Sequence, residues 1–567
     1  MPPAPDDPAL RLALRNTIGD ALRRSARKHR DRIALHFGDR RWTYAGLDAA
    51  VTRLARALLA MGLEPGDRVA ALGRNSDTYV LLFLACARAG FIHVPVNFML
   101  TGRELLYILN QSGSRAVFYD AQLEPAVAAV RDQAAATLFA TMESLLETVL
   151  AAGPGEEGSG AAPGAGSPAP ASGSPASAGG APDAAAGGAP DAGGDAGDDA
   201  GGDAAGDAAF AAVDEDQVVQ LLYTSGTTAA PKGAMMTHRA LLAEYLSCIV
   251  ELDIQHHDRC LHALPLYHSA QMHVFLMPQL LVGATGWILP APVPEVCLPL
   301  IARQRINSMF APPTVWINFL RHPEFDRHDL SSLKKVYYGA SIMPVPVLQE
   351  LRQRLPGVAV YNCYGQSEIA PLATVLRPEE HDARPASAGR PVLHVETRVV
   401  DPDMRDVPPG QLGEIVHRSP QLLVGYWEKP EETAEAFQGG WFHSGDLGYM
   451  DEEGYLYVVD RIKDVINTGG VLVASREVEE VLYTHPAVSE VAVIALPDPR
   501  WIEAVTAVVV LKRGATATAD DLIAHARQHL APFKVPKRVI FVDDLPRNAS
   551  GKILKRELRA RFAEGTG

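Results

Sequence analysis

The chain has 567 residues, more than one hydrophobic core usually organises, so at least two domains are expected. Hydrophobic residues make up 47% of the sequence and charged residues 21%, a composition typical of a globular protein that folds in water. A formal net charge of −15 disfavours nucleic acid as a partner.

The cysteines and the first residues indicate in which cellular compartment the protein is expected. The five cysteines lack the paired spacing of a disulfide framework or a zinc site, which favours a reducing compartment. They are Cys86, Cys248, Cys260, Cys297 and Cys363. The opening residues, Met-Pro-Pro-Ala-Pro-Asp-Asp, do not resemble a signal peptide, and no run of 18 apolar residues occurs. We therefore expect a cytoplasmic protein without an integral membrane segment.

Helix and strand patterns alternate along the first 120 residues. Apolar residues recur at helical spacing over residues 43–62, behind the potential cap Thr43. Further helices are expected from about Asn75 and after Thr101, which forms a capping-box pattern with Glu104. Strands are expected at residues 68–72, 92–96 and 115–119. This alternation predicts a doubly wound α/β sheet.

Residues 153–209 differ from the rest of the chain in composition. They consist almost entirely of Gly, Ala, Pro, Ser and Asp, and nine acidic residues but no Lys or Arg lie between Glu156 and Asp207. Such a segment cannot bury enough surface to offset the entropy of ordering it. We expect a disordered insert, which is either a passive surface excursion or a tether or partner-binding segment.

Residues 221–238 pass from an apolar run into a loop rich in hydroxyl groups and glycine. The hydroxyls can bind phosphate oxygens, the glycines let the backbone approach an anion, and the lysine adds a positive charge. The residues concerned are Thr224, Ser225, Gly226, Thr227, Thr228, Lys232 and Gly233. This is not the common P-loop, because Pro231 and Gly233 flank Lys232. The pattern predicts a phosphate loop, with a surface turn as the alternative.

Two later segments could line a ligand pocket. Pro265-Leu-Tyr-His-Ser269 leads into an amphipathic stretch, and His268 within it is either a site residue or a core histidine. Val336-Tyr-Tyr-Gly-Ala-Ser341 predicts a strand that ends on the small residues Gly339, Ala340 and Ser341. Small side chains there would let a planar ring approach the backbone.

Two further motifs offer carboxylates. Tyr361-Asn-Cys-Tyr-Gly-Gln-Ser-Glu368 ends on the carboxylate of Glu368, which is either a site residue or a solvated glutamate. Gly439-Gly-Trp-Phe-His-Ser-Gly-Asp446 places Asp446 at an expected strand end, where a carboxylate could accept both hydroxyls of a ribose.

The last hundred residues predict a small α+β domain. Strands are expected at 488–496 and 504–512, and a helix at 519–530. Near the end, Leu545-Pro-Arg-Asn-Ala-Ser-Gly-Lys552 carries a lysine on a Ser-Gly loop. Such a lysine is usually only solvated.

These motifs, in this order over residues 220–556, resemble the adenylate-forming superfamily of acyl-CoA synthetases, peptide-synthetase adenylation domains and luciferases, and most closely its fatty acyl-CoA synthetases. The signature loop of that superfamily is Tyr-Thr-Ser-Gly-Thr-Thr-Gly-x-Pro-Lys-Gly, and the chain departs from it at Ala229. The resemblance implies an α/β fold: a large N-terminal domain of doubly wound sheets with helices and a small distorted β-barrel, followed by a small mobile α+β lid.

The same resemblance implies domain limits. Residues 1–152 and 210–462 would form the N-terminal domain around the insert at 153–209. Residues 463–567 would form the C-terminal lid, with Lys463 as the hinge.

The resemblance also assigns roles. Lys552, Glu368, His268 and Thr224 would be catalytic, with Glu368 and Thr224 as Mg²⁺ ligands and His268 guarding the carboxylate end of the acyl pocket. The nucleotide and coenzyme would contact Thr224, Ser225, Gly226, Thr227, Thr228, Lys232, Gly339, Ala340, Ser341, Tyr364, Gly365, Ser367, Asp446, Arg461, Lys552, Gly469 and Gly470. Tyr364 would stack on adenine, and His268, Met272, Gly339 and Tyr361 are the candidate walls of the acid pocket.

The implied reaction joins a fatty or polycyclic carboxylic acid to coenzyme A with Mg-ATP, through an acyl-adenylate. Relatives commonly have Gly-Gly-Glu-Asn beside the tunnel for the thiol, whereas this chain has Gly469-Gly-Val-Leu472. An alternative is therefore an enzyme that stops at the acyl-adenylate and hands it to a partner ligase or a carrier protein. A third reading is a non-catalytic scaffold built around the acidic insert, and nothing in the sequence favours a luciferase-like oxidation.

Overall fold

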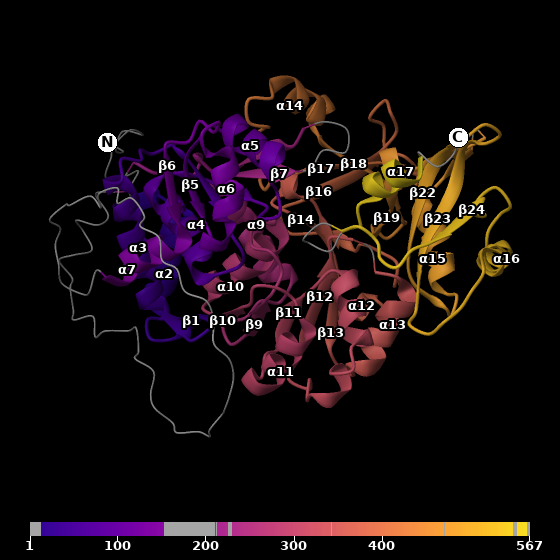
Figure 1. Cartoon of the computed structure of the whole chain (residues 1–567), viewed down its shortest axis with the longest axis horizontal. Helices are drawn as coiled ribbons and strands as arrows, with labels where there is room; N and C mark the ends of the chain where they lie inside the picture. The colour runs from indigo at the N-terminus through magenta and orange to yellow at the C-terminus, as the bar shows by residue number, and fades with distance from the viewer. Residues whose placement is uncertain are drawn as a thin grey trace, which may run out of the picture.

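The computed structural model describes residues 13–151, 210, 212–224, 230–341, 343–469, 471–547 and 553–563. Within these ranges the chain forms a large N-terminal part with three β-sheets and a smaller C-terminal α+β part, which is yellow at the right of Figure 1. The insert expected at 153–209 lies outside the described residues and stays a prediction. None of the described helices is long and apolar enough to cross a membrane.

A mixed sheet of six described strands leads into the expected phosphate loop. Its order is β6 (Leu138–Thr141), β5 (Ser114–Tyr119), β3 (Arg68–Leu72), β4 (Ile92–Val96), β7 (Val218–Thr224) and β8 (Lys232–Thr237). Neighbouring strands run parallel except β7 and β8, which are antiparallel. The three expected strands are confirmed to within one residue. Because β7 pairs with β4, the strand that follows the insert completes the sheet begun before it.

Helices that pack around this sheet begin largely where the sequence predicts. They are α2 (Ile18–Lys28), α3 (Tyr44–Ala60), α4 (Asp77–Ala89), α5 (Gly102–Gln111), α6 (Glu124–Arg131), α7 (Met142–Ala151) and α9 (His238–Glu251), with the short η1 (Ala121–Leu123). Thr43 caps α3, since its hydroxyl accepts a hydrogen bond from the Gly46 amide (3.0 Å). The capping box expected at Thr101 is wrong. The amide of Glu104 donates to the Thr101 carbonyl instead (3.2 Å), which leaves the hydroxyl outside the cap.

The second sheet is larger and has helices on both faces. Its order is β15 (Arg390–Pro391), β14 (Leu372–Leu376), β13 (Ala359–Gly365), β12 (Lys335–Gly339), β11 (Ser308–Phe310), β9 (Arg259–His262), β10 (Thr285–Ile288), β1 (Ile33–Phe37) and β2 (Arg40–Thr43). The strands from β13 to β1 are parallel, and β2, β14 and β15 are antiparallel edges. Alternate residues of β12 face opposite cores: Val336 and Tyr338 pack on one side and Tyr337 on the other.

Further helices accompany this sheet. They are the π-helix η2 (Ala270–Leu276), α10 (Met277–Val282), α11 (Pro294–Gln304), α12 (Pro313–Arg321) and α13 (Val345–Arg354), and the short η3 (Phe325–Arg327), η4 (Ser367–Ile369) and η5 (Pro378–Glu380). A π-helix is rare and often marks a functional site. Here it follows directly on the segment that contains His268.

Where a small distorted β-barrel is expected, the described residues form a four-stranded antiparallel sheet. Its order is β16 (Glu396–Val400), β17 (Gly413–Arg418), β18 (Phe442–Met450) and β19 (Leu456–Arg461), and α14 (Pro430–Ala436) and η6 (Gln438–Gly440) lie between β17 and β18 in the sequence. Its last strand leads into the C-terminal part.

The C-terminal part has its own hydrophobic core. It comprises η7 (Ile462–Asp464), β20 (Ile466–Thr468), β21 (Val471–Val473), α15 (Ser475–Tyr483), β22 (Val488–Asp498), β23 (Ile502–Leu511), α16 (Ala519–His529), β24 (Arg538–Phe541) and α17 (Lys555–Ala563). The sheet order is β21-β20-β23-β22, with β24 against β23. The expected strands and helix of this region are confirmed to within two residues.

One residue of this part is held in an unfavourable backbone conformation. Ile502, the first residue of β23, has a φ of +67°, in the left-handed region that β-branched residues rarely adopt. Its side chain is 61% exposed, so burial does little to offset the strain.

Replacing Ile502 by glycine is expected to raise the free energy of unfolding of the C-terminal part by about 0.5–1 kcal/mol. Relief of left-handed strain, about 1–2 kcal/mol, exceeds the entropic cost of glycine, about 0.5–1 kcal/mol. Hydrogen exchange of the β22 and β23 amides in the full chain measures the change. Val510→Gly, at an extended position of the same strand, is the matched control and is expected to destabilise. Equal losses in both variants would contradict the assignment of strain.

Candidate active site

The two ends of the expected phosphate loop are held together by the hairpin of β7 and β8. Thr224 and Lys232 are directly paired in this hairpin. The loop residues Ser225, Gly226, Thr227 and Thr228 lie outside the described residues. Gly233 packs flat on a tyrosine ring, where a Cβ would lie 3.2 Å from Cζ of Tyr223. Thr224 and Lys232 therefore enter the site from a fixed β-hairpin.

Lys232 and Glu368 converge on one aromatic residue that the sequence analysis missed. The ammonium of Lys232 lies 5.0 Å from the ring centroid of Tyr426. The hydroxyl of Tyr426 donates a hydrogen bond to Oε1 of Glu368 (3.3 Å). The sequence signal was weak, because Gly-Tyr-Trp at 425–427 contains no side chain that typically binds phosphate or metal.

The turn that carries Glu368, η4, is fixed from two sides. The hydroxyl of Ser367 lies 2.8 Å from that of Ser269, and the Leu423 amide donates to the Glu368 carbonyl (2.9 Å). Below the turn, the buried Glu244 accepts hydrogen bonds from the Leu372 amide (3.0 Å) and from the side chain of Gln421 (2.6 Å). Burial raises the pKa of Glu244 well above its ordinary value. No motif in the sequence pointed to this buried carboxyl.

Asp446, the expected ribose ligand, already has two partners. Its Oδ1 lies 2.6 Å from Nε of Arg461, and its Oδ2 accepts a hydrogen bond from the Tyr364 hydroxyl (2.7 Å). The expectation that Asp446 ends a strand is wrong. It lies in the middle of β18 opposite Arg461 of β19, next to an irregularity in the pairing. The structure thus brings Tyr364, Asp446 and Arg461 together, as expected for one nucleotide site.

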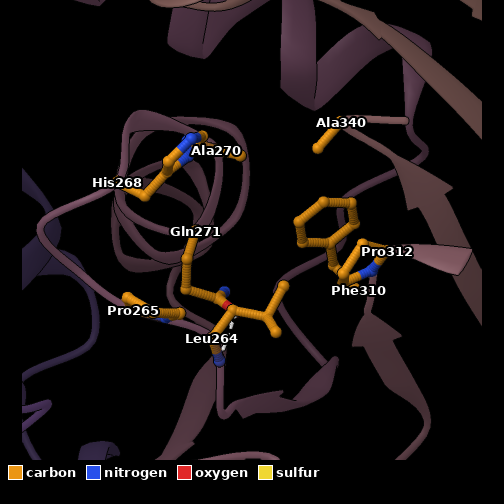
Figure 2. A pocket seen from close by; sticks show the side chains of 8 residues that line it. All are labelled: Leu264, Pro265, His268, Ala270, Gln271, Phe310, Pro312 and Ala340. Atoms are coloured by element: carbon orange, nitrogen blue, oxygen red, sulfur yellow. Dashed lines mark hydrogen bonds between the residues drawn. The ribbon is translucent and has the colours of Figure 1, made fainter. Parts of the chain in front are cut away.

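A small, mostly apolar pocket lies between residues 264–271 and the ends of strands β11 and β12 (Figure 2). It is lined by Leu264, Pro265, His268, Ala270, Gln271, Phe310, Pro312 and Ala340. In Figure 2, His268 and Gln271 lie on one side, and Phe310, Pro312 and Ala340 lie on the other. The Gln271 side chain donates to Nδ1 of His262 (3.0 Å), and burial lowers the pKa of His262 to about 3. Gln271 is therefore held in place by a neutral histidine.

The residues around Gly339 explain why this wall is built from small side chains. A Cβ at Gly339 would lie 2.1 Å from the carbonyl oxygen of Cys363. Ala340 has a φ of +61°, and strained residues of this kind cluster at functional sites. Ser341 follows Ala340 and is half-buried.

An aromatic stack lies behind the pocket. Phe310 stacks on Phe275 with ring centroids 4.5 Å apart, Phe275 lies 5.0 Å from Tyr337, and Tyr337 lies 5.1 Å from Tyr361. Tyr361 therefore lies behind the residues that line the pocket. Met272, another candidate wall, is buried in the hydrophobic core around the first sheet and is not among the residues that line this pocket.

The start of the C-terminal part is close to these charges. Lys463 lies in η7, where burial, aided by Arg461 and Lys232, lowers its pKa. The Gly469 amide donates to the carbonyl of Trp501 (2.6 Å), while Gly470 and Lys552 lie outside the described residues.

A chain of polar contacts links α17 to β19. Lys555 donates to the Ser475 hydroxyl (2.6 Å) and pairs with Glu479 (2.8 Å). The same Ser475 hydroxyl donates to Asp460 of β19 (2.7 Å). The helix that follows Lys552 is therefore anchored to the last strand of the N-terminal part.

The oxygen donors of this site suit Mg²⁺ better than a metal that is held by three or more protein side chains. Among the described residues, no cluster of three or more His, Cys, Asp or Glu side chains could hold a metal ion. Mg²⁺ typically takes one or two protein oxygens and completes its shell with phosphate oxygens and water. Glu368 and Thr224 are oxygen donors of this kind.

Comparisons with known proteins agree with this arrangement. A family model described as AMP-binding enzyme matches residues 22–427, and one described as AMP-binding enzyme C-terminal domain matches residues 477–552. A feruloyl-CoA synthase of an Amycolatopsis species is 37% identical over 539 residues, 95% of this chain and 98% of that protein. The medium/long-chain-fatty-acid–CoA ligase FadD8 of Mycobacterium tuberculosis is 33% identical, over 97% of this chain and 90% of that protein.

A solved structure extends the likeness to the fold. The crystal structure of ATP-bound MatB from Rhodopseudomonas palustris has a TM-score of 0.81 and 30% sequence identity, over 97% of this chain and 100% of that one. The match spans both the N-terminal and the C-terminal parts. The chain belongs to the adenylate-forming family of AMP-binding enzymes, and it is an AMP-forming acid–CoA ligase.

Proposed function

We propose that this ligase activates a compact hydrophobic carboxylic acid with Mg-ATP and transfers the acyl group to coenzyme A. The observation that carries the proposal is the mostly apolar pocket between His268 and Phe310, which shares Ala340 with the segment expected to contact the nucleotide. The aromatic stack that continues from Phe310 through Phe275 and Tyr337 would limit extension on that side, which favours a single ring over a long acyl chain or a polycyclic acid.

The first half-reaction requires two anions to approach each other. A carboxylate oxygen attacks the α-phosphorus of ATP, a new C–O–P link forms, and pyrophosphate leaves. Lys232 and Arg461 supply positive charge on the protein side, and Lys552 would join them from the C-terminal part. Mg²⁺ held by Glu368 and Thr224 would offset phosphate charge when bound. Asp446 would hold the ribose and Tyr364 the adenine, which fixes the α-phosphorus relative to the pocket.

The second half-reaction replaces the phosphate by sulfur. The coenzyme A thiolate attacks the acyl carbonyl, the C–S bond forms, and AMP leaves. We propose that the C-terminal part turns about Lys463 to bring the Gly469-Gly470 segment to the pocket. Leu472 beyond this segment is 67% exposed, so it offers an apolar surface where relatives have a polar residue.

Pyrophosphate release from Mg-ATP, measured with a panel of carboxylic acids and with or without coenzyme A, tests the proposal. Aromatic acids such as cinnamic-type acids are expected to outperform fatty acids, and turnover is expected only with coenzyme A. Release that coenzyme A leaves unchanged would indicate delivery of the acyl-adenylate to a partner ligase or carrier protein. Absence of acid-dependent release would refute the proposed activity.

Replacing Lys552 by methionine is expected to slow adenylation by about 10²–10³-fold, which corresponds to about 3–4 kcal/mol, because one preorganised positive charge is lost at the α-phosphate. Pyrophosphate exchange with ATP measures this step. Transfer from supplied acyl-adenylate to coenzyme A is the internal control and should change little. Equal losses in both steps would contradict the role assigned to Lys552.

Replacing Phe310 by leucine is expected to shift acid preference toward longer chains. The change removes one ring of the stack behind the pocket, so the ratio of kcat/KM for an octanoic-type acid to that for an aromatic acid should rise about tenfold. Phe319→Leu is the matched control, since Phe319 is equally buried but lies on α12 away from the pocket. An unchanged ratio in the Phe310 variant would exclude this residue as the end of the acid site.

A further inference from the structure

We propose that Tyr426 is a positioning residue that keeps Lys232 and Glu368 apart while holding both of them in the site. The inference rests on the proposed function, because it assigns Lys232 to phosphate and Glu368 to Mg²⁺. In this assignment Tyr426 contacts neither ATP nor the carboxylic acid. Tyr426 acts through the two charged side chains that lie on either side of it.

The two contacts of Tyr426 match the charges of its neighbours. The ring face, which is electron-rich, lies under the Lys232 ammonium at 5.0 Å. The hydroxyl donates to Oε1 of Glu368 at 3.3 Å. Burial, together with the nearby Glu368 charge, raises the pKa of Tyr426 above its ordinary value, so the phenol keeps its proton and remains a donor.

Backbone bonds fix the position of Tyr426 from both sides. We call residues 423–427 the strap. The Leu423 amide donates to the Glu368 carbonyl (2.9 Å), and the Trp427 amide donates to the Gly233 carbonyl (2.8 Å). Between them, Met235 of β8 exchanges backbone hydrogen bonds with the strap at 3.0 and 2.9 Å. The strap therefore joins the lysine strand to the glutamate turn and places the tyrosine ring between the two charges.

This arrangement keeps two opposite charges from pairing with each other. Lys232 and Glu368 have opposite charges, and a direct ion pair would satisfy each with the other and oppose the binding of phosphate and metal. Within the part of the chain that the structure describes, neither side chain forms an ion pair. The single hydrogen bond to Oε1 leaves Oε2 of Glu368 available, and the ring face stabilises the ammonium without a counter-charge.

Tyr426→Phe separates the two contacts, because it keeps the ring under Lys232 and removes the hydroxyl from Glu368. We expect the Mg²⁺ concentration at half-maximal adenylation to rise about tenfold, with the thermal midpoint unchanged. Tyr426→Leu also removes the ring, and we expect an additional rise of about tenfold in the KM for ATP. Calorimetric titration of ATP at several Mg²⁺ concentrations, without acid, gives a second readout that does not depend on turnover.

Tyr455→Phe is the matched control. Tyr455 is also buried, donates its hydroxyl to a glutamate (Glu380, 2.8 Å) and contacts two cations, Arg384 and Arg390, but it precedes β19 and contacts neither Lys232 nor Glu368. This variant should leave both the Mg²⁺ dependence and the KM for ATP unchanged.

Two outcomes would overturn the inference. One is a Mg²⁺ midpoint in Tyr426→Phe within twofold of the wild type, in both the kinetic and the calorimetric titrations. The other is an equal shift in Tyr455→Phe, which would indicate a general loss of stability. Failure of the proposed function is distinguishable, because the wild type would then show no acid-dependent pyrophosphate release while the calorimetric comparison would still decide the role of Tyr426.

Discussion

Like charges must meet in this site, since a carboxylate has to approach a triphosphate, and the fold is arranged around that constraint. The site contains positively charged side chains that lie close to acidic residues without being fully neutralised by them. Lys232 is held on the face of a tyrosine ring, and Arg461 shares the carboxylate of Asp446 with Tyr364. In each case a tyrosine hydroxyl donates to the carboxylate, Tyr426 to Glu368 and Tyr364 to Asp446. The site is therefore electrostatically prepared before any ligand arrives, as transition-state stabilisation requires.

The three sheets contribute different parts of this arrangement. The first supplies Lys232 from a hairpin, the second supplies the pocket wall and the Glu368 turn, and the small antiparallel sheet supplies Asp446 and Arg461. The strap at 423–427 connects the first two by backbone bonds, and buried polar residues such as Glu244 support the turn from below. The pocket wall is held by close packing of Gly339 against the Cys363 carbonyl, by the stacking of Phe310 on Phe275, and by the hydrogen bond between Gln271 and His262.

Much of this fold could be predicted from local sequence patterns. Strands β3, β4 and β5 followed from short apolar runs and the Thr43 cap from a single hydroxyl, signals that depend only on neighbours in the sequence. The motifs located Lys232, Glu368, Tyr364 and Asp446, but not their mutual contacts. Tyr426, Gln421 and Glu244 were missed because their roles depend on residues far away in the chain. Met272 lies in a π-helix, which alters which residues share a face, and periodicity alone does not reveal such a helix.

The engagement of Asp446 by Tyr364 and Arg461 has a consequence for the catalytic cycle. Under the role proposed for Asp446, the hydroxyls of an entering ribose would replace the phenol and guanidinium already bound, so the net gain in hydrogen bonds would be small. When AMP departs, the same two side chains would return to the carboxylate, and no buried charge would be left bare. The groups that stabilise the empty site would in this way also ease product release.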